Sequence, residues 1–228
     1  MSRGIPEGAL RDHLWCTVEP AGDPQISEVA IRVQICSDDR LLSQEAASLV
    51  ADEIRRQVAT KGMAVMLLDG SPALEECYRK LSEENLPWTQ VVAFQLAEWR
   101  GLAEEDPRSG RRLLLETLVR RVPMAEFHSL RGEAANPAAV CVNYERLMIR
   151  RRPDLAVVAV GGQGEIGTPP VISYTAGGVQ SGSRVGWNTA SIGVSLGALL
   201  ECGSVVVIGD SWPAEAGSPG VARFTLRG

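Results

Sequence analysis

This sequence has few histidines, and its cysteines do not form a metal-binding pattern. Among its 228 residues the chain has two histidines, His13 and His128, and five cysteines. The cysteines are scattered without a Cys-x-x-Cys pair, and neither histidine lies at ligand spacing from another histidine or a cysteine. Structural zinc sites need four such ligands at short spacings, and disulfide scaffolds need a dense set of cysteines, so the sequence argues against both. We expect no metal and no other cofactor.

Long hydrophobic runs and an excess of basic residues are also absent. The longest apolar runs, such as residues 64–68 and 156–160, are far shorter than the roughly 20 residues of a membrane span. Residues 1–13 carry charges and lack the apolar segment of a signal peptide. With 23 Lys and Arg against 28 Asp and Glu, the formal charge is −5, unlike the basic balance of most nucleic-acid binders. The sequence thus predicts a cytoplasmic protein that binds neither membranes nor nucleic acid.

What remains is the composition of an ordinary globular protein, with 45% hydrophobic and 22% charged residues. A chain of this length can bury a sizeable core without disulfides or metals. Residues 1–27 are rich in glycine, proline and charge, which predicts a flexible N-terminal arm, although Trp15 and Cys16 indicate that part of it docks on the body. We expect residues 28–228 to form a single α/β domain.

Strand and helix patterns alternate along this domain. The expected strands are residues 29–35, 63–68, 89–96, 154–160 and 205–208, and the expected helices are residues 42–61, 73–81, 109–121 and 136–151. Such alternation predicts a three-layer α/β/α Rossmann-like parallel sheet. Ligands of these sheets bind at the carboxyl ends of the strands, so the turns at Asp69, Ala97 and Gly161 are the expected walls of a site. Arg111 and Arg112 are expected to be solvated at a helix end.

The first of these turns reads Asp69-Gly70-Ser71-Pro72. It offers backbone donors and a hydroxyl where a strand gives way to a helix, which suits a phosphate. In a second interpretation Ser71 only caps the helix, with Pro72 at the first helical position, and no ligand is needed. Both interpretations remain open from the residues alone.

The third turn is rich in glycine and matches Gly-x-Gly-x-x-Gly through Gly162, Gly164 and Gly167. A dinucleotide site would require a helix to follow, but Thr168 is followed by two prolines, which resist one. A loop whose backbone N–H groups approach an anion explains the pattern better. A tight turn without a ligand is the alternative.

Together these motifs resemble the glucosamine-6-phosphate deaminase/6-phosphogluconolactonase family. Residues 68–72 are similar to the family's phosphate loop L-P-T-G-G-T-P, one residue shorter, and residues 94–102 are similar to F-N-M-D-E-Y-V-G-L. Residues 162–168 resemble G-x-G-x-D-G-H. The similarity covers roughly residues 42–210, and the E-x-x-G-L…P-x-S spacing favours the deaminase branch. The resemblance implies a deaminase/lactonase-type fold and a small-molecule sugar phosphate as the ligand.

The departures from this family fall on its catalytic positions. Ala97 stands where the deaminases carry the acid that moves a proton between sugar carbons 1 and 2. Ile166 and Thr168 stand at the Asp and His of G-x-G-x-D-G-H, where the His assists ring opening. None of these three side chains can act as a general acid or base at neutral pH.

Two carboxylates remain near the lost positions. Glu98 matches the second acid of the family's D-E pair, and Glu165 directly precedes the position of the missing Asp. We expect them to share a pocket as catalytic residues, with His128 as a third candidate, while Arg184 stands where the family often binds phosphate. The alternatives are two solvated loop glutamates, a packing histidine and an exposed loop arginine.

The sequence therefore supports two hypotheses about function. The first is a diverged enzyme that isomerises, deaminates or ring-opens a sugar phosphate or amino sugar, in a specialised biosynthetic pathway. The second is a pseudoenzyme that binds a sugar phosphate as a sensor or as the partner of an active subunit. Homo-oligomers are common in the family, so the resemblance leaves self-assembly open.

Overall fold

A computed structural model describes residues 14–18, 28–160, 185–187, 191–195, 198–199, 201–209 and 220–227 of the chain. Its main feature is an eight-stranded sheet in the order β1-β2-β11-β10-β7-β3-β4-β6. The strands are β1 (Leu14–Val18), β2 (Glu28–Ile35), β3 (Ala64–Leu68), β4 (Val91–Gln95), β6 (Glu126–His128), β7 (Leu155–Val160), β10 (Ser204–Gly209) and β11 (Gly220–Arg227). Strands β10, β7, β3, β4 and β6 are parallel, which confirms the predicted α/β fold.

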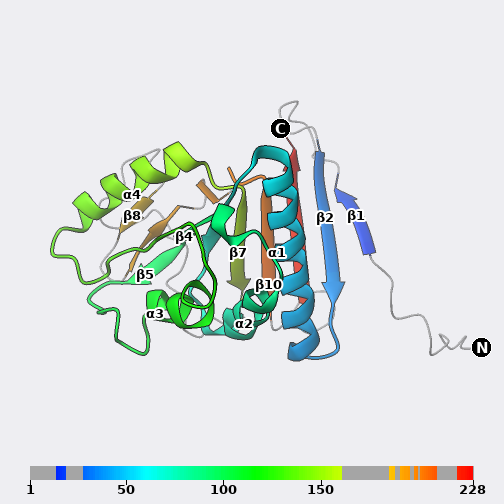
Figure 1. The fold of residues 1–228 in the computed structure, drawn as a ribbon, viewed down its shortest axis with the longest axis horizontal. Helices are drawn as coiled ribbons and strands as arrows, with labels where there is room; N and C mark the ends of the chain where they lie inside the picture. Colours follow the sequence, from blue (N-terminus) through cyan, green and yellow to red (C-terminus); the bar gives the residue numbers. More distant parts are fainter. Residues whose placement is uncertain are drawn as a thin grey trace, which may run out of the picture.

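The other side of the sheet is antiparallel (Figure 1). Strand β11 lies between β10 and β2 and runs antiparallel to both, and β1 pairs antiparallel with β2 at the edge. The Pro- and Gly-rich sequence after residue 210 predicted no further strand, so β11 is a difference from the expected fold. Residues 14–18, inside the expected arm, form the edge strand β1.

The helices are α1 (Asp39–Lys61), η1 (Pro72–Leu74), α2 (Glu75–Glu83), η2 (Trp88–Gln90), α3 (Gly110–Leu114), η3 (Leu115–Val119) and α4 (Pro137–Arg151). Helix α1 begins where the Asp38 side chain accepts a hydrogen bond from the N–H of Leu41 at 2.9 Å, and it ends at Gly62, whose φ is 79°. Helix α3 continues into the π-helical turn η3. None of the helices among the described residues has both the length and the apolarity needed to cross a membrane.

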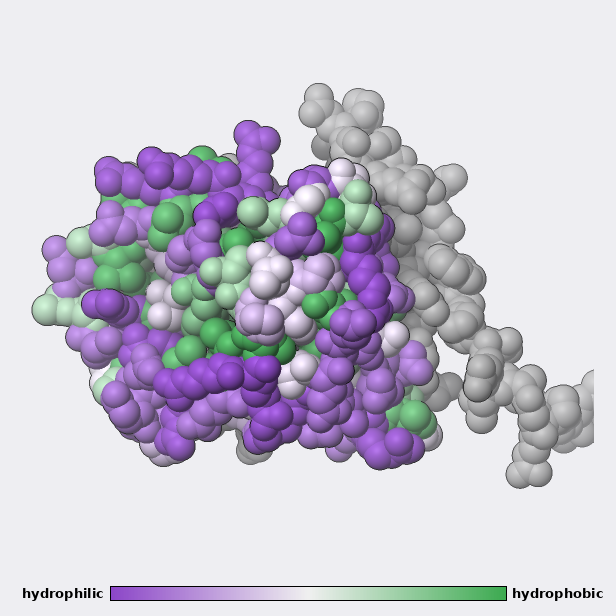
Figure 2. Space-filling model, in the orientation of Figure 1, coloured by the Kyte–Doolittle hydropathy of each residue, from purple (hydrophilic) through white to green (hydrophobic). Residues whose placement is uncertain are grey.

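The core has two parts, one on each face of the sheet, because neighbouring strand residues point in opposite directions. Met66 and Leu68 of β3 pack in the part that includes α1 and α2, which lie in front of the sheet in Figure 1. Val65 and Leu67 pack in the other part, which includes α4. The result is three layers, and Figure 2 shows mostly polar side chains on the outside of the front layer, with smaller apolar areas between them.

A buried charge joins α1 to the antiparallel side of the sheet. Glu53 of α1 is fully buried, and its carboxylate accepts hydrogen bonds from Arg56, from Gln57 at 2.8 Å and from Arg223 of β11. Arg223 also donates to the Ser204 hydroxyl on β10 at 3.2 Å. One carboxylate thereby links α1 to the last two strands.

Candidate functional site

A small second sheet continues the carboxyl edge of the main one. It contains β5 (Ala97–Trp99), β9 (Ser191–Val194) and β8 (Val185–Trp187), in the antiparallel order β5-β9-β8. Leu96, between β4 and β5, donates its N–H to the carbonyl of Leu68 at 2.7 Å and accepts one from Val194 at 2.8 Å. The ends of β3, β4 and β9 are therefore fixed together where the sequence predicts a site.

The turn after β3 is held from both sides. The N–H of Asp69 donates to the carbonyl of Val157 at 3.1 Å, and its buried carboxylate accepts the N–H of Ala159 at 3.1 Å. Tyr78 of α2 donates its hydroxyl to the Asp69 carbonyl at 2.7 Å. Burial, with the Asp69 charge as a smaller contribution, raises the pKa of Tyr78 well above its usual value, so this hydroxyl keeps its proton. The turn is thus tied to both β7 and α2.

Gly70 and Ser71 follow in the same turn. A Cβ on Gly70 would lie 2.5 Å from the Cα of Gly110, so the two backbones meet where only glycine fits. Ser71 occupies the N-cap position of η1 and Pro72 begins that helix, yet the Ser71 side chain makes no capping hydrogen bond. The helix therefore does not use the hydroxyl that the capping interpretation assigned to it.

Ala97 fills the position of the family's first acid with a packed methyl group. It is 3% exposed and pairs with Gly193 of β9. A Cβ on Gly193 would lie 2.8 Å from that of Ala97, so this strand pair approaches as closely as the small residues allow. There is no proton-transfer group at this place.

Glu98 is 1% exposed, and its carboxylate accepts hydrogen bonds from five donors. Oε1 accepts the N–H of Trp99 at 2.8 Å and of Gly110 at 3.2 Å. Oε2 accepts the Gln95 amide at 3.0 Å, the Ser109 hydroxyl at 2.9 Å and the N–H of Arg111 at 2.8 Å. Glu98 is therefore no solvated loop residue, because both of its oxygens bind groups of the protein.

Gln95, which the sequence analysis did not single out, connects this carboxylate to its surroundings. Its amide nitrogen donates to the carbonyl of Ala97 at 2.8 Å as well as to Glu98, and its amide oxygen accepts the N–H of Leu130 at 3.1 Å. The Tyr144 hydroxyl donates to the Gln95 carbonyl at 2.6 Å. The signal in the sequence was its position at the Asn of F-N-M-D-E-Y.

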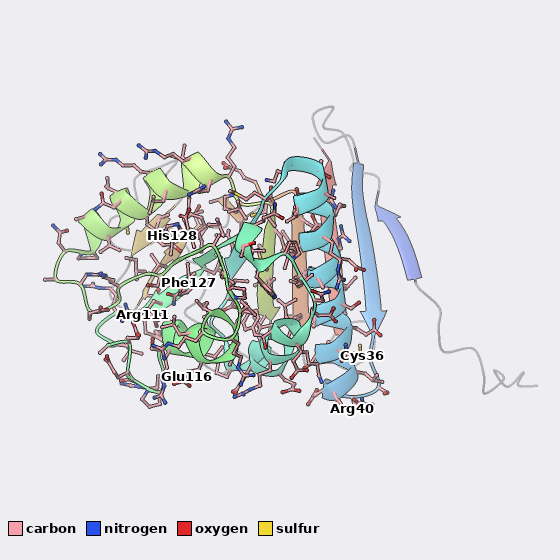
Figure 3. The ribbon with its side chains drawn as sticks, viewed as in Figure 1. Cys36, Arg40, Arg111, Glu116, Phe127 and His128 are labelled. Atoms are coloured by element: carbon pink, nitrogen blue, oxygen red, sulfur yellow. The ribbon has the colours of Figure 1, made fainter. Side chains whose placement is uncertain are left out.

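Arg111 lies in the first turn of α3 and is buried. The expectation of a solvated helix end is wrong for it, since it is 6% exposed. Its guanidinium (Figure 3) lies 3.4 Å from the carboxylate of Glu104, in the loop before α3, and 3.4 Å from that of Glu133, in the loop between β6 and α4. The reason is tertiary: two loops fold back over the start of α3 and bring their carboxylates with them.

His128 lies at the edge of the main sheet, close to α4 (Figure 3). Its ring packs against Phe94 with 4.6 Å between centroids, and its Nε2 is 3.0 Å from the Glu126 carboxylate. Its carbonyl accepts the Tyr144 hydroxyl at 3.1 Å, and Arg151 of α4 also bonds to Glu126. These contacts join β6 to β4 and α4.

The remaining predicted site residues lie outside the described residues. They are Gly162, Gly164, Glu165, Gly167, Thr168 and Arg184. The shared pocket of Glu98 and Glu165 therefore stays a prediction.

The four cysteines whose side chains the structure describes offer no activated nucleophile. Cys77 and Cys202 are buried, and burial raises the pKa of each thiol to about 12. Burial also raises the pKa of Cys36 and of Cys141 to about 11. A thiol with a raised pKa is protonated at neutral pH and reacts slowly.

We therefore expect a Cys16→Ser variant to show no fast reaction with a thiol reagent at pH 8 in the native state. The four remaining thiols should react only after denaturation in guanidinium chloride. The absorbance of the coloured thiol that the reagent releases measures the number of reactive thiols in the native and in the denatured protein. Rapid labelling of even one thiol in the folded variant would contradict the burial described above.

The fold first places the protein in the α/β class, and the sequence comparison then gives its family. A mostly parallel sheet covered by helices on both faces is an α/β fold, and ligands of such folds bind at the carboxyl ends of the parallel strands. The sequence profile of the glucosamine-6-phosphate isomerases/6-phosphogluconolactonases matches residues 37–166, more than half of the chain. The chain belongs to this family, which confirms the resemblance.

Curated relatives are glucosamine-6-phosphate deaminases at low identity. One from Streptococcus sanguinis is 24% identical over 180 residues, which cover 72% of this chain and 77% of that protein. One from Streptococcus pneumoniae is 29% identical over 126 residues, or 55% of this chain and 53% of that protein. One from Alkaliphilus metalliredigens is 29% identical over 146 residues, which cover 60% of this chain and 58% of that protein. The matched region thus spans little more than half the length of the last two relatives.

Solved structures from both branches share the fold. A monomeric glucosamine-6-phosphate deaminase superposes with a TM-score of 0.60 at 22% identity, covering 75% of this chain and 79% of that one. The 6-phosphogluconolactonase of Trypanosoma brucei gives a TM-score of 0.64 at 14% identity, covering 79% and 84%. At such identities the likeness concerns the fold alone.

Proposed function

We propose that this protein binds a sugar phosphate at the carboxyl edge of its sheet without the deaminase proton transfer at position 97. The observation that carries the proposal is Ala97, a methyl group packed against Gly193 where the deaminase branch carries an acid. Its neighbour Glu98 has both oxygens bound to five donors of the protein. The family supports the ligand class, and the two residues support a sensor or partner-subunit role.

The turn of residues 69–72 is the proposed phosphate site. It lies at the carboxyl edge, where ligands of parallel sheets bind. Gly70 lets the turn lie directly against Gly110 of α3, and the hydroxyl of Ser71 is not used to cap η1. Asp69 holds the turn to β7, so its donors would be ordered before a ligand arrives.

A diverged enzyme is the second candidate. The observation in its favour is that Glu98 is a buried carboxyl group directly beside the lost acid. That mechanism would require Glu98 to exchange an internal partner for a substrate hydrogen, with Glu165 or His128 as the second group. Isomerisation, deamination and ring opening, in a specialised pathway or elsewhere, all depend on this exchange.

Ligand binding and turnover separate the two candidates. We expect glucosamine 6-phosphate, fructose 6-phosphate or 6-phosphogluconate to raise the melting temperature, and their unphosphorylated forms to have no effect at equal concentration. Saturation to 100 times Kd corresponds to about 2.7 kcal/mol of stabilisation. We expect no ammonia release from glucosamine 6-phosphate in a coupled assay.

Two outcomes would contradict the proposed function. Ammonia release or isomerisation that disappears in Glu98→Gln or Glu165→Gln would establish the diverged enzyme in place of the binding protein. If none of the phosphorylated sugars stabilises the protein, the proposed ligand class is wrong.

A further inference from the structure

The five donors to Glu98 come from segments that are separate in the sequence. Gln95 ends β4 and Trp99 belongs to β5, on either side of Glu98. The other three are consecutive residues at the start of α3, namely Ser109, Gly110 and Arg111. A single buried carboxylate therefore fixes the position of the first turn of α3 relative to the sheet.

The first helical turn of α3 also contacts the proposed phosphate site of residues 69–71. Gly110 is the contact, because a Cβ placed on it would lie 3.2 Å from the Cα of Gly70 and 3.5 Å from the Gln95 amide nitrogen. Ser109 strengthens the same point, since its hydroxyl donates to Glu98 and accepts the N–H of Arg112 at 3.3 Å. An unbroken chain of contacts leads from Glu98 through Gly110 to Gly70.

We propose that Glu98 is a positioning residue, which holds the turn of residues 69–71 in place for a phosphate through Ser109 and Gly110, and that it does not contact the sugar. The inference rests on the proposed function and says how its binding site is kept in shape. Backbone donors bind an anion well only when they are held in the right geometry beforehand, and the loss of one hydrogen bond to a charged group lowers affinity about 10-fold or more.

Glu98→Gln tests this role because the two side chains have the same shape. The new NH2 group must replace either Oε1, which faces the N–H groups of Trp99 and Gly110, or Oε2, which faces that of Arg111. In both orientations an amide donor meets backbone donors that cannot turn away. The start of α3 must therefore move, and Gly70 loses its fixed neighbour.

Glu53→Gln is the matched control. It also replaces a fully buried carboxylate that binds several donors, but those donors lie on α1 and β11. Loss of general stability affects both variants, whereas loss of the turn geometry affects only Glu98→Gln. Ser109→Ala is a milder second variant, since it removes one of the five donors and leaves the carboxylate in place.

The experiment measures Kd for glucosamine 6-phosphate by calorimetry and for glucosamine by ligand-observed NMR, in the wild type and the three variants. We expect Glu98→Gln to raise Kd for the phosphorylated ligand about 10-fold or more and to leave Kd for glucosamine within about twofold. Glu53→Gln should change neither Kd by more than about twofold, and Ser109→Ala should weaken only the phosphorylated ligand, by about threefold.

The inference is overturned if Glu98→Gln, or Ser109→Ala where Glu98→Gln does not fold, keeps the wild-type preference for the phosphorylated ligand. It is equally overturned if Glu53→Gln loses that preference to the same extent. A wild type that does not prefer the phosphorylated ligand would refute the proposed function, and the inference with it, before any variant is measured.

Discussion

Replacing Glu53 by glutamine is expected to lower the free energy of unfolding by about 3 kcal/mol or more. The carboxylate is fully buried and binds Arg56 and Arg223, and the Arg223 side chain is itself only 21% exposed. Removing one partner of a buried ion pair leaves an uncompensated charge, which typically costs about 3–5 kcal/mol. The amide of glutamine keeps the volume but not the charge, so the loss is electrostatic rather than a cavity.

Urea unfolding followed by circular dichroism measures this effect, provided that the slope of the transition is unchanged. Arg56→Ala is the control, because its side chain is 51% exposed and its loss should cost less than about 1 kcal/mol. A double variant with Met in place of both Glu53 and Arg223 should recover most of the stability, since no charge is then left buried. A midpoint for Glu53→Gln equal to that of the wild type would contradict the ion-pair account.

Gly70→Ala is the second substitution with a large expected effect. The new methyl group would lie 2.5 Å from the Cα and 2.6 Å from the carbonyl oxygen of Gly110, and both atoms belong to backbone that cannot turn aside. Overpacking of this kind costs typically about 1–3 kcal/mol, and a clash with backbone belongs at the upper end. The turn and α3 must separate, so we also expect the variant to lose its preference for phosphorylated sugars.

Gly110→Ala provides the matched comparison from the other side of the same contact. Its methyl group would lie 3.2 Å from the Cα and the carbonyl oxygen of Gly70, a tight contact that small shifts can relieve. We expect a loss of stability of about 1 kcal/mol or less, measured by the same urea titration. If both variants were equally stable, the close approach of the turn and α3 would not be what requires glycine at residue 70.

Much of the fold could be predicted from local signals. The sequence predicted a helix over residues 42–61, and α1 covers Asp39–Lys61, between the N-cap Asp38 and the left-handed Gly62. The apolar runs predicted β3 and β7, because a strand buried on both faces needs no polar alternation. Strand β11 was missed because the Gly- and Pro-rich stretch before it favoured irregular structure, although apolar Phe224 and Leu226 alternate in the sequence with polar Arg223 and Thr225.

The location of the site could be predicted from the sequence, but the contacts within it could not. Sequence order placed Asp69 and Glu98 at the carboxyl edge because parallel strands end at one edge. It did not predict the partners of Glu98, since Ser109, Gly110 and Arg111 lie eleven to thirteen residues further on. Whether a loop of that length returns to its starting point depends on packing at both of its ends, which no local pattern records.

The sequence by itself determined the family, the alternation of the central parallel strands with their helices, and the loss of the acid at Ala97, because these depend on residue types and their spacing. The tertiary structure alone decided what surrounds the retained acid. It placed Glu98 among five hydrogen-bond donors and brought Gly110 against Gly70. A carboxylate acquires its role from the groups that fold around it, and here those groups connect it to the turn of residues 69–71.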